Sequence, residues 1–438
     1  MPMLSWASMR KIVAKAVRGD IKLIGWGAAG AFDIHYAACP YKYAYLIDRN
    51  PELQGTMLNG IPILRPETLA QEDPSKVLVV IFPHVLYAKE IGEAIDAMGS
   101  YWYCYPFEFS FVTDRLGTVA RTLAEPLPSK AVTSDTAIVV QGPFQPGVTD
   151  EILGFYRRLY PGHRLVLSTW VGLSPDHCAL AEQLCHDVVL NEPPKSAGIS
   201  NRNYQTISTC GGIDAAAAKG ARYVLKARSD MLMVEKSALP VMRQFCQELP
   251  AGSGTHRRIV TTSMFSRRYL PYHFSDMFQF GEVDTVREFY DIPMNVDAVS
   301  NIAIAGGSLT MAEFARRMLP PECEYGSNFA RRLGYEVDFS IGQYWEIARR
   351  HFAVLDAHTL NMFWLKYGSG GIGCRIEDRL SCEPLDHMFW SRLSSGFDMS
   401  ADLAGVDIER VTVSEMFAHP RAWVQWFSGF ADEPLPQA

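Results

Sequence analysis

The sequence predicts an α/β protein built from two parallel-sheet regions, and three observations carry this prediction. Short apolar strand-like runs alternate with helical segments along most of the chain. An early run, residues 21–24, leads into a glycine-rich turn, and a later run, residues 223–225, leads into alternating charges. Both endings are typical of a buried parallel strand whose carboxyl end opens into a binding site.

Composition limits the classes of partner. Of the 438 residues, 48% are hydrophobic and 20% are charged, which suits two domains with sizeable cores. The net charge of −7 argues against a broad basic surface, so we expect no nucleic acid partner. The nine cysteines form no C-x-x-C pair or zinc-type spacing, and no apolar run approaches the roughly 18 residues of a membrane span. We therefore expect a cytoplasmic protein with reduced thiols.

Residues 1–20 predict a basic amphipathic helix. Four basic residues alternate there with apolar ones, and the segment lacks the continuous apolar stretch of a signal peptide. The first interpretation is a helix packed on the first domain. The alternative is peripheral contact with anionic lipid at the inner face of the cytoplasmic membrane.

A nucleotide-binding module is predicted for residues 1–125. Strand 21–24 is followed by the G-x-G-x-x-G motif of Gly25, Gly27 and Gly30 and then by an apolar helix. In this context the glycines let the backbone approach a phosphate at a helix N-terminus. Asp48 ends the next strand 18 residues after Gly30, near the position of a ribose-binding acid. With a third strand at 77–82, the segment forms a compact βαβαβ unit.

This unit resembles the small Rossmann-like modules that precede some sugar-modifying enzymes. The shared features are the glycine motif, the Ile47-Asp48 strand end and Asn59-Gly60-Ile-Pro-Ile, in that order. The resemblance implies that the module binds a nucleotide or nucleotide-sugar. The alternative is that the glycines only allow tight packing of helix against strand.

A second domain, residues 126–438, is predicted to begin at the proline-containing linker 125–130. Its strands are expected at 136–140, 165–168, 188–190 and 223–225, with helices at 149–159, 174–185 and 201–218 between them. Strand 223–225 is followed directly by Lys226, Arg228 and Asp230. The helix that carries Asn201 and Arg202 is expected to begin at the same edge of the sheet. An anionic ligand suits this edge.

Five blocks of this domain resemble the WavE lipopolysaccharide-synthesis family. They are IVVQGP at 138–143, NRNYQTIST at 201–209, ARYVLKARSD at 221–230, YHFSDMFQFG at 272–281, and FAVLD at 352–356 with Lys366-Tyr367. The resemblance implies a sugar transferase with a GT-A-like sheet and a nucleotide-diphosphate-sugar donor. It also implies that Gln141, Gly142 and Pro143 lie near the donor's nucleoside.

The charged strand end departs from the metal-binding pattern of that fold. Where an Asp-x-Asp would hold a divalent ion on the donor diphosphate, this chain has Arg228-Ser229-Asp230. Mg²⁺ or Mn²⁺ bound by Asp230 alone is one interpretation, because such ions take few carboxylates beside the substrate's phosphates. The other is that Arg228 or Lys226 neutralises the leaving diphosphate directly.

Three residues are candidates for the acid–base work of transfer. Asp276 is the first choice for the base that takes the acceptor hydroxyl's proton, with His273 as an acceptor or phosphate contact. Glu313 is a second candidate base, on a segment that is otherwise a solvated charged helix. The alternative for Asp276 and His273 is a structural role in a turn.

The sequence therefore favours an enzyme, a glycosyltransferase that adds a sugar to a lipopolysaccharide or capsule-type glycan. Two other hypotheses stay open: a nucleotide-dependent oxidoreductase or epimerase that uses the first module, and a non-catalytic nucleotide-sugar-binding assembly protein. The sugar, nucleotide, acceptor, stereochemistry and oligomeric state do not follow from the sequence.

Overall fold

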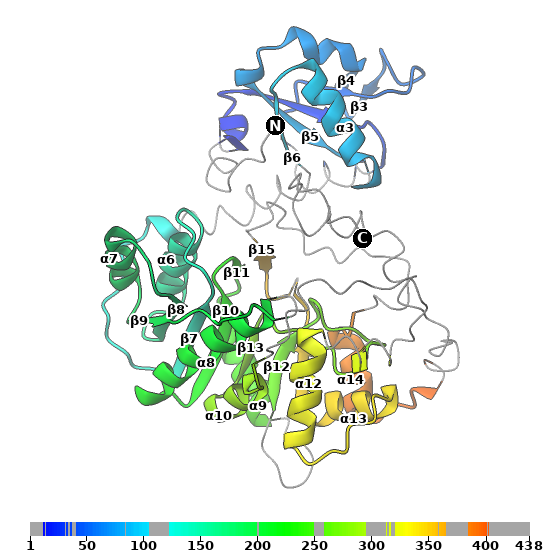
Figure 1. Cartoon of the computed structure of the whole chain (residues 1–438). Coiled ribbons are helices and arrows are strands. Elements are labelled where there is room, and N and C mark those ends of the chain that lie inside the picture. The colour runs from blue at the N-terminus through cyan, green and yellow to red at the C-terminus, as the bar shows by residue number, and fades with distance from the viewer. Residues whose placement is uncertain are drawn as a thin grey trace. The chain divides into compact units, whose positions relative to one another are not determined.

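The computed structural model describes residues 12–104, 122–248, 258–294, 312–364 and 384–402, apart from short gaps within these ranges. The chain forms two compact units that separate between Ala124 and Glu125 (Figure 1). Each unit has its own sheet, and each is described by itself.

The first unit contains one six-stranded sheet. Its strands are β1 (Lys22–Trp26), β2 (Tyr45–Ile47), β3 (Met57–Leu58), β4 (Ile61–Leu64), β5 (Val77–Ile81) and β6 (Trp102–Cys104), in the order β3-β4-β2-β1-β5-β6. All neighbours are parallel except the β3–β4 hairpin. The chain moves outward from β1 first on one side and then on the other, which is Rossmann-like winding. The predicted module fold is confirmed.

The core of this unit follows from its strand sequences. Strand β5 reads Val-Leu-Val-Val-Ile and is buried on both faces, and helix α3 (Val85–Met98) contributes Ile91 and Ile95 to the same core. The turn of the β3–β4 hairpin is Asn59-Gly60, both with positive φ (53° and 78°), as a two-residue hairpin turn requires. Two short 3-10 helices, Pro66–Gln71 and Pro74–Lys76, lead into β5.

The second unit is organised on a seven-stranded sheet. Its strands are β7 (Thr136–Gln141), β8 (Arg164–Trp170), β9 (Asp187–Asn191), β10 (Tyr223–Arg228), β12 (Ile259–Thr262), β13 (Gln279–Glu282) and β14 (Phe352–Leu355), in the order β14-β12-β13-β10-β7-β8-β9. Only β13 runs antiparallel to its neighbours. Two further strands, β11 (Met231–Met233) and β15 (Met362–Trp364), form a separate pair.

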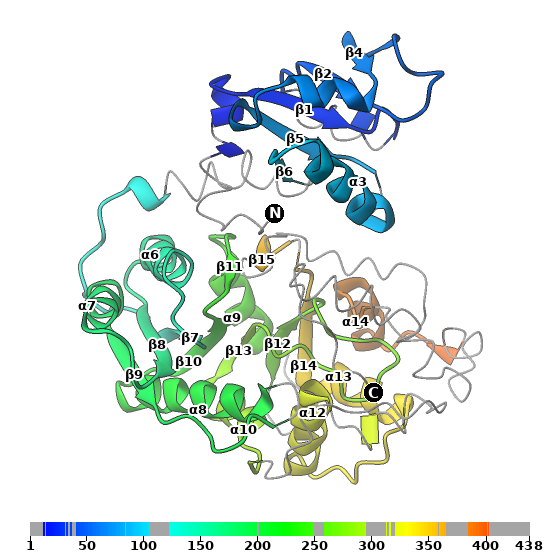
Figure 2. The ribbon, with the colours of Figure 1, turned by 45° about the horizontal axis from the view of Figure 1, so that its top comes forward.

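Helices cover both faces of this sheet. They are α6 (Thr149–Leu159), α7 (Pro175–Leu184), α8 (Arg202–Ala218), α9 (Ala238–Glu248), α10 (Val283–Tyr290), α12 (Pro321–Arg332), α13 (Ile341–His351) and α14 (His387–Ser394). Helix α8 packs on β7, β8 and β9, on the side opposite α6 (Figure 2). Gly212 makes this possible, since a Cβ there would lie 2.4 Å from Val139 Cγ1.

The α/β class expected from the sequence is confirmed in both units. One strand prediction needs correction, because the run expected to end at Leu225 continues through Arg228. Lys226 and Arg228 are therefore strand residues paired with β7, not loop residues beyond the strand. Among the described residues, no helix is both long and apolar enough to cross a membrane.

Candidate functional site

The candidate site lies where the second sheet changes its direction of winding. Strands β8 and β9 follow β7 on one side, whereas β10 pairs with β7 on its other side. Ligands of open α/β sheets bind at the carboxyl ends of strands at such a switch point. Here those ends are Gln141 of β7 and Arg228 of β10, which are paired in register.

Two backbone features hold these strand ends together. Ser229 N–H donates to the Gln141 carbonyl at 2.8 Å. Gly142 has φ of +126°, and a Cβ there would meet Ser229 Oγ at 2.6 Å, so the close approach requires glycine. The Gln141 side chain is 4% exposed and accepts from Ser208 Oγ on α8 at 2.7 Å. Pro143 follows and leads toward Thr149, whose hydroxyl donates to the Ser229 carbonyl at 3.0 Å.

Lys226 is a completely buried cation beneath this edge. Its ammonium donates to the backbone carbonyl of Asp276 and lies 5.2 Å from the centre of the Tyr290 ring. Burial lowers the pKa of Lys226 to about 7, although the negative charge of Asp276 acts in the opposite direction. Lys226 therefore contributes positive potential without reaching solvent only while it is protonated, below about pH 7.

Arg228 and Asp230 form a bidentate ion pair. Arg228 Nε donates to one Asp230 oxygen at 2.9 Å and Nη2 to the other at 3.0 Å. Their side chains are 23% and 8% exposed, so the guanidinium is the more accessible partner. Both carboxylate oxygens of Asp230, the residue predicted to bind a metal, therefore accept hydrogen bonds from Arg228.

Asp276 is presented by the loop between β12 and β13. The preceding residue, Ser275, is held on both sides: its N–H donates to Ser266 Oγ at 3.0 Å, and its carbonyl accepts from Thr261 Oγ1 at 2.9 Å. Asp276 Oδ2 accepts from Gln205 Nε2 of α8, whereas Oδ1 is buried and has no hydrogen-bond partner within the described structure. The sequence-predicted Asp276 therefore lies next to Lys226.

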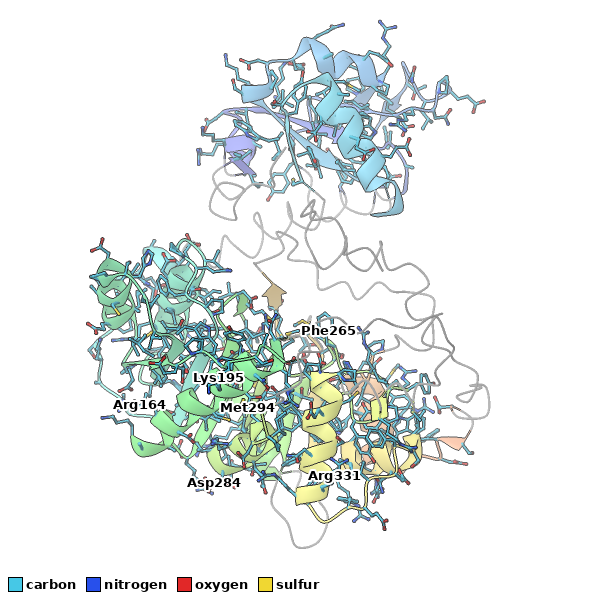
Figure 3. The ribbon with its side chains drawn as sticks, viewed as in Figure 1. Arg164, Lys195, Phe265, Asp284, Met294 and Arg331 are labelled. Atoms are coloured by element: carbon cyan, nitrogen blue, oxygen red, sulfur yellow. The ribbon has the colours of Figure 1, made fainter. Side chains whose placement is uncertain are left out.

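His273 belongs to the same loop and is a neutral imidazole. Burial, followed by the charge of Arg267, lowers the pKa of His273 to about 3. Its Nε2 lies 3.7 Å from Glu322 Oε2. The loop adopts positive φ at two non-glycine residues, Phe265 (61°) and Tyr272 (62°), which is a strained conformation often found at functional sites. Figure 3 labels Phe265 in this loop.

Glu322 is the site residue that the sequence reasoning missed. It lies in the first turn of α12, next to Pro321. Burial, followed by the negative charge of Asp276, raises the pKa of Glu322 to about 8. The available signal was the Pro320-Pro321-Glu322 sequence, because proline at the first helical position followed by an acid is typical of a helix start.

A glycine brings Glu322 to His273. A Cβ on Gly326, one turn further along α12, would lie 2.2 Å from the Tyr272 carbonyl oxygen. Only glycine allows the helix to touch the backbone that carries His273. Figure 3 labels Arg331 on α12, beyond this contact.

The remaining predicted donor residues, Asn201 and Arg202, begin α8. Asn201 is the N-cap residue with φ of 62° and makes no side-chain capping bond. Arg202 is 2% exposed, pairs with Glu324 of α12, and donates to the Pro293 carbonyl at 2.8 Å. Arg202 therefore joins α8 to α12, and donor binding by these two residues stays a prediction.

The glycine motif of the first unit serves packing at two of its three positions. A Cβ on Gly25 would lie 2.6 Å from Leu46 Cδ2, and one on Gly27 (φ +101°) 2.7 Å from Pro83 Cδ, whereas Gly30 faces open space. Asp48 accepts from Ala28 N–H and Asn50 N–H, both at 2.8 Å. The Asp48 carboxylate thus stabilises the loop itself, and nucleotide binding by these residues stays a prediction.

Two further predictions have little structural context. Glu313 lies outside the described residues. Within the part of the chain that the structure describes, no three acidic, histidine or cysteine side chains gather as metal ligands would.

Comparison with known proteins identifies the region that carries this site. Residues 136–339 match the WavE lipopolysaccharide synthesis family. The match begins with β7 and ends beyond α12, so the WavE region, residues 136–339, includes every residue of the switch-point site. The family resemblance seen in the sequence is thereby confirmed over this span.

Similarity to other known proteins is low. No curated protein matches the chain. A solved structure described as mannose-1-phosphate geranyltransferase from Thermus thermophilus is similar at 15% identity and a TM-score of 0.23, covering 50% of this chain and 69% of that one. A likeness this low carries no inference about function.

Proposed function

We propose that the second unit is a glycosyltransferase that moves a sugar from a nucleotide-diphosphate-sugar to a lipopolysaccharide-type glycan. The observation that carries this proposal is the meeting of Lys226, Arg228, Asp230 and Asp276 at the switch point of the WavE region. The sheet order, with β13 as its antiparallel member, supports the GT-A-like fold expected from the family resemblance.

The donor is assigned to the ends of β7 and β10. Gln141 and Gly142 would lie along the nucleoside, where Gly142 lets the end of β7 approach Ser229 closely. Arg228 would exchange one or both of its bonds to Asp230 for the diphosphate, which an arginine fork binds with two parallel hydrogen bonds. Buried Lys226 lies beneath the leaving group and adds positive potential there while it is protonated, below about pH 7.

We propose transfer with inversion, which needs a proton acceptor on the side of the sugar opposite the diphosphate. The acceptor hydroxyl oxygen forms a bond to the anomeric carbon as the bond from that carbon to the diphosphate oxygen breaks. The electron pair leaves with the diphosphate, and the hydroxyl proton goes to a carboxylate. Asp276, Glu322 and neutral His273 supply the groups on this side.

The side chains at this edge do not fit a metal centre of their own. Asp230 would have to give up Arg228 to bind Mg²⁺ or Mn²⁺, and the described residues contain no cluster of further ligands around it. If Arg228 binds the diphosphate, the guanidinium balances the negative charge of the phosphates directly, and no second carboxylate is needed to hold a metal ion. The donor binding proposed for Arg228 therefore needs no divalent ion.

We also propose that the protein works in the cytoplasm, at the inner face of the cytoplasmic membrane. A growing lipopolysaccharide glycan is attached to lipid, so the transferase would meet its acceptor at that surface. Binding of the purified chain to anionic vesicles, measured by sedimentation, tests this location, and failure to bind would remove the membrane from the proposal.

Thermal shifts with a panel of nucleotide-sugars test the transferase proposal. The probes are UDP-glucose, UDP-galactose, UDP-N-acetylglucosamine, GDP-mannose and ADP-heptose, each with and without Mn²⁺, with NAD(H) as a comparison. One donor should raise the melting temperature of the wild type, because a ligand that binds only the folded state stabilises it. Stabilisation by NAD(H) alone would favour the oxidoreductase alternative and overturn the proposal.

Variants of the strand end locate the donor. Arg228→Ala combined with Asp230→Asn removes the ion pair without leaving an unpaired buried carboxylate. It should weaken donor binding by about 10- to 100-fold, as expected for charged hydrogen bonds. Arg222→Ala is the matched control, because Arg222 precedes the same strand at its opposite end and its side chain is 65% exposed. Equal donor affinity in both variants would remove Arg228 from the site.

A further inference from the structure

We propose that Glu322, rather than Asp276, accepts the proton of the acceptor hydroxyl. This inference rests on the transfer reaction proposed above and assigns its proton acceptor. Glu322 follows Arg228 by 94 residues (322 − 228) in the chain. The fold nevertheless brings Glu322 of α12 close enough to Arg228, at the end of β10, for their charges to interact.

Accessibility separates the two carboxylates. Asp276 is 3% exposed, one of its oxygens accepts from Gln205, and the other is buried. The Glu322 side chain is 16% exposed, and its carboxylate interacts with its own backbone N–H and lies 3.7 Å from His273 Nε2. Glu322 is therefore the more accessible of the two carboxylates.

Glu322 is also rigidly placed. It lies in the first turn of α12, where Pro321 occupies the first helical position, and Gly326 lets the helix touch the backbone at Tyr272. On the side of the β12–β13 loop, the His273 ring restricts the positions that the Glu322 carboxylate can take. A base held on a helix keeps its distance to the reacting hydroxyl better than one on a loop.

The surrounding charges suit a proton acceptor. The ionisable groups that act on Glu322 are Asp276 and Arg267 of the β12–β13 loop and Arg228 and Lys226 of β10, with His273 neutral beside it. Burial and the Asp276 charge raise the pKa of Glu322 to about 8, which makes it a stronger base than an ordinary carboxylate. Asp276 then acts as a positioning residue that keeps Glu322 basic.

The proton balance of the step is simple. An ionised Glu322 oxygen takes the hydroxyl proton as the acceptor oxygen bonds to the anomeric carbon, and the diphosphate leaves with the electron pair of the broken bond. Glu322 then releases the proton to water through its exposed edge.

The test compares four variants of the full chain on the donor identified by the thermal-shift panel. They are Glu322→Gln, Glu322→Asp, Asp276→Asn and the control Glu336→Gln, an exposed glutamate outside the site. Release of nucleoside diphosphate is followed from pH 5.5 to 9.5. Glu322→Gln should lower kcat by about 10²- to 10⁴-fold with the donor KM unchanged, and Glu322→Asp should retain part of the activity.

The pH profile distinguishes catalysis from a structural role. In the wild type, kcat/KM should rise with pH up to a plateau above about 8, and this limb should be absent in Glu322→Gln. Retention of the limb in Glu322→Gln, or its loss only in Asp276→Asn, would overturn the inference while leaving the transferase proposal standing. A wild type that binds and turns over no donor would instead overturn the proposed function, and this inference with it.

A stability measurement checks the protonation without any donor. Because the pKa of Glu322 is raised on folding, the folded chain holds a proton that the unfolded chain releases between pH about 4.3 and 8. The wild type should therefore lose stability relative to Glu322→Gln as the pH rises through this window. A difference in melting temperature that stays constant from pH 5 to 9 would contradict the assignment.

Discussion

Substitution of Gly326 by alanine tests the contact that places Glu322. The added Cβ would lie 2.2 Å from the Tyr272 carbonyl oxygen and 3.0 Å from Phe274 Cδ2. The first of these atoms is backbone and cannot rotate away, so α12 or the β12–β13 loop must move. Overpacking of this kind costs about 3 kcal/mol at the upper end of its usual range.

Helix propensity offsets part of that cost. Alanine is favoured over glycine by about 1 kcal/mol in a helix interior, which leaves a net destabilisation of about 2 kcal/mol for Gly326→Ala. Each kcal/mol lowers the melting temperature of a unit of 150–250 residues by about 2–4 °C, and the second unit is larger, so we expect a fall of at most about 4 °C.

The matched control is Gly342→Ala in α13. A Cβ on Gly342 meets nothing within 4 Å, so the same substitution should leave stability unchanged or raise it by up to about 1 kcal/mol. Thermal unfolding of both variants by circular dichroism, at one pH and protein concentration, gives the comparison. If Gly326→Ala melted at or above Gly342→Ala, the close approach of α12 to the loop would be refuted.

Two further predictions concern buried or half-buried charges. Asp48→Asn leaves one of two N–H groups, Ala28 or Asn50, without its acceptor, so thermal unfolding should show a loss of about 1 kcal/mol; unchanged stability would mean that the carboxylate does not hold the glycine loop. For Lys226, burial lowers the pKa to about 7, so the unfolded chain binds a proton that the folded chain lacks between pH about 7 and 10.4, and wild-type stability should rise with pH across that window. Lys226→Met should lack this rise in pH-dependent urea unfolding, and an identical slope in both proteins would show that Lys226 is not buried as described.

Several residues of the candidate site could be selected from the sequence because their signals are local. The glycine motif after β1, the charged ending of β10 and the 272–281 block are short stretches whose residue types and order can be read directly. Asp276 and His273 became candidates in this way, and the structure places the Asp276 backbone carbonyl against the Lys226 ammonium.

Other features depended on distant partners. The pairing of Arg228 with Asp230 was not expected, because both were assigned separately to the donor diphosphate or a metal. Glu322 was not a candidate from the sequence because its place in the site depends on His273 and Asp276, which precede it by 49 (322 − 273) and 46 (322 − 276) residues. The Pro320-Pro321-Glu322 sequence marks the start of a helix, but it does not show that Glu322 faces His273.

Local patterns were enough to predict the α/β class, the Rossmann-like module of the first unit and the family resemblance of the WavE region. Hydrophobic periodicity, turn residues and short motifs act between neighbours in the chain, so they can be read without the fold. Only the folded chain shows which charges are buried, which carboxylate is more accessible and which pKa values shift. Those properties depend on burial and on charges a few ångströms away, and the order of strands in the sheet sets which distant residues become neighbours.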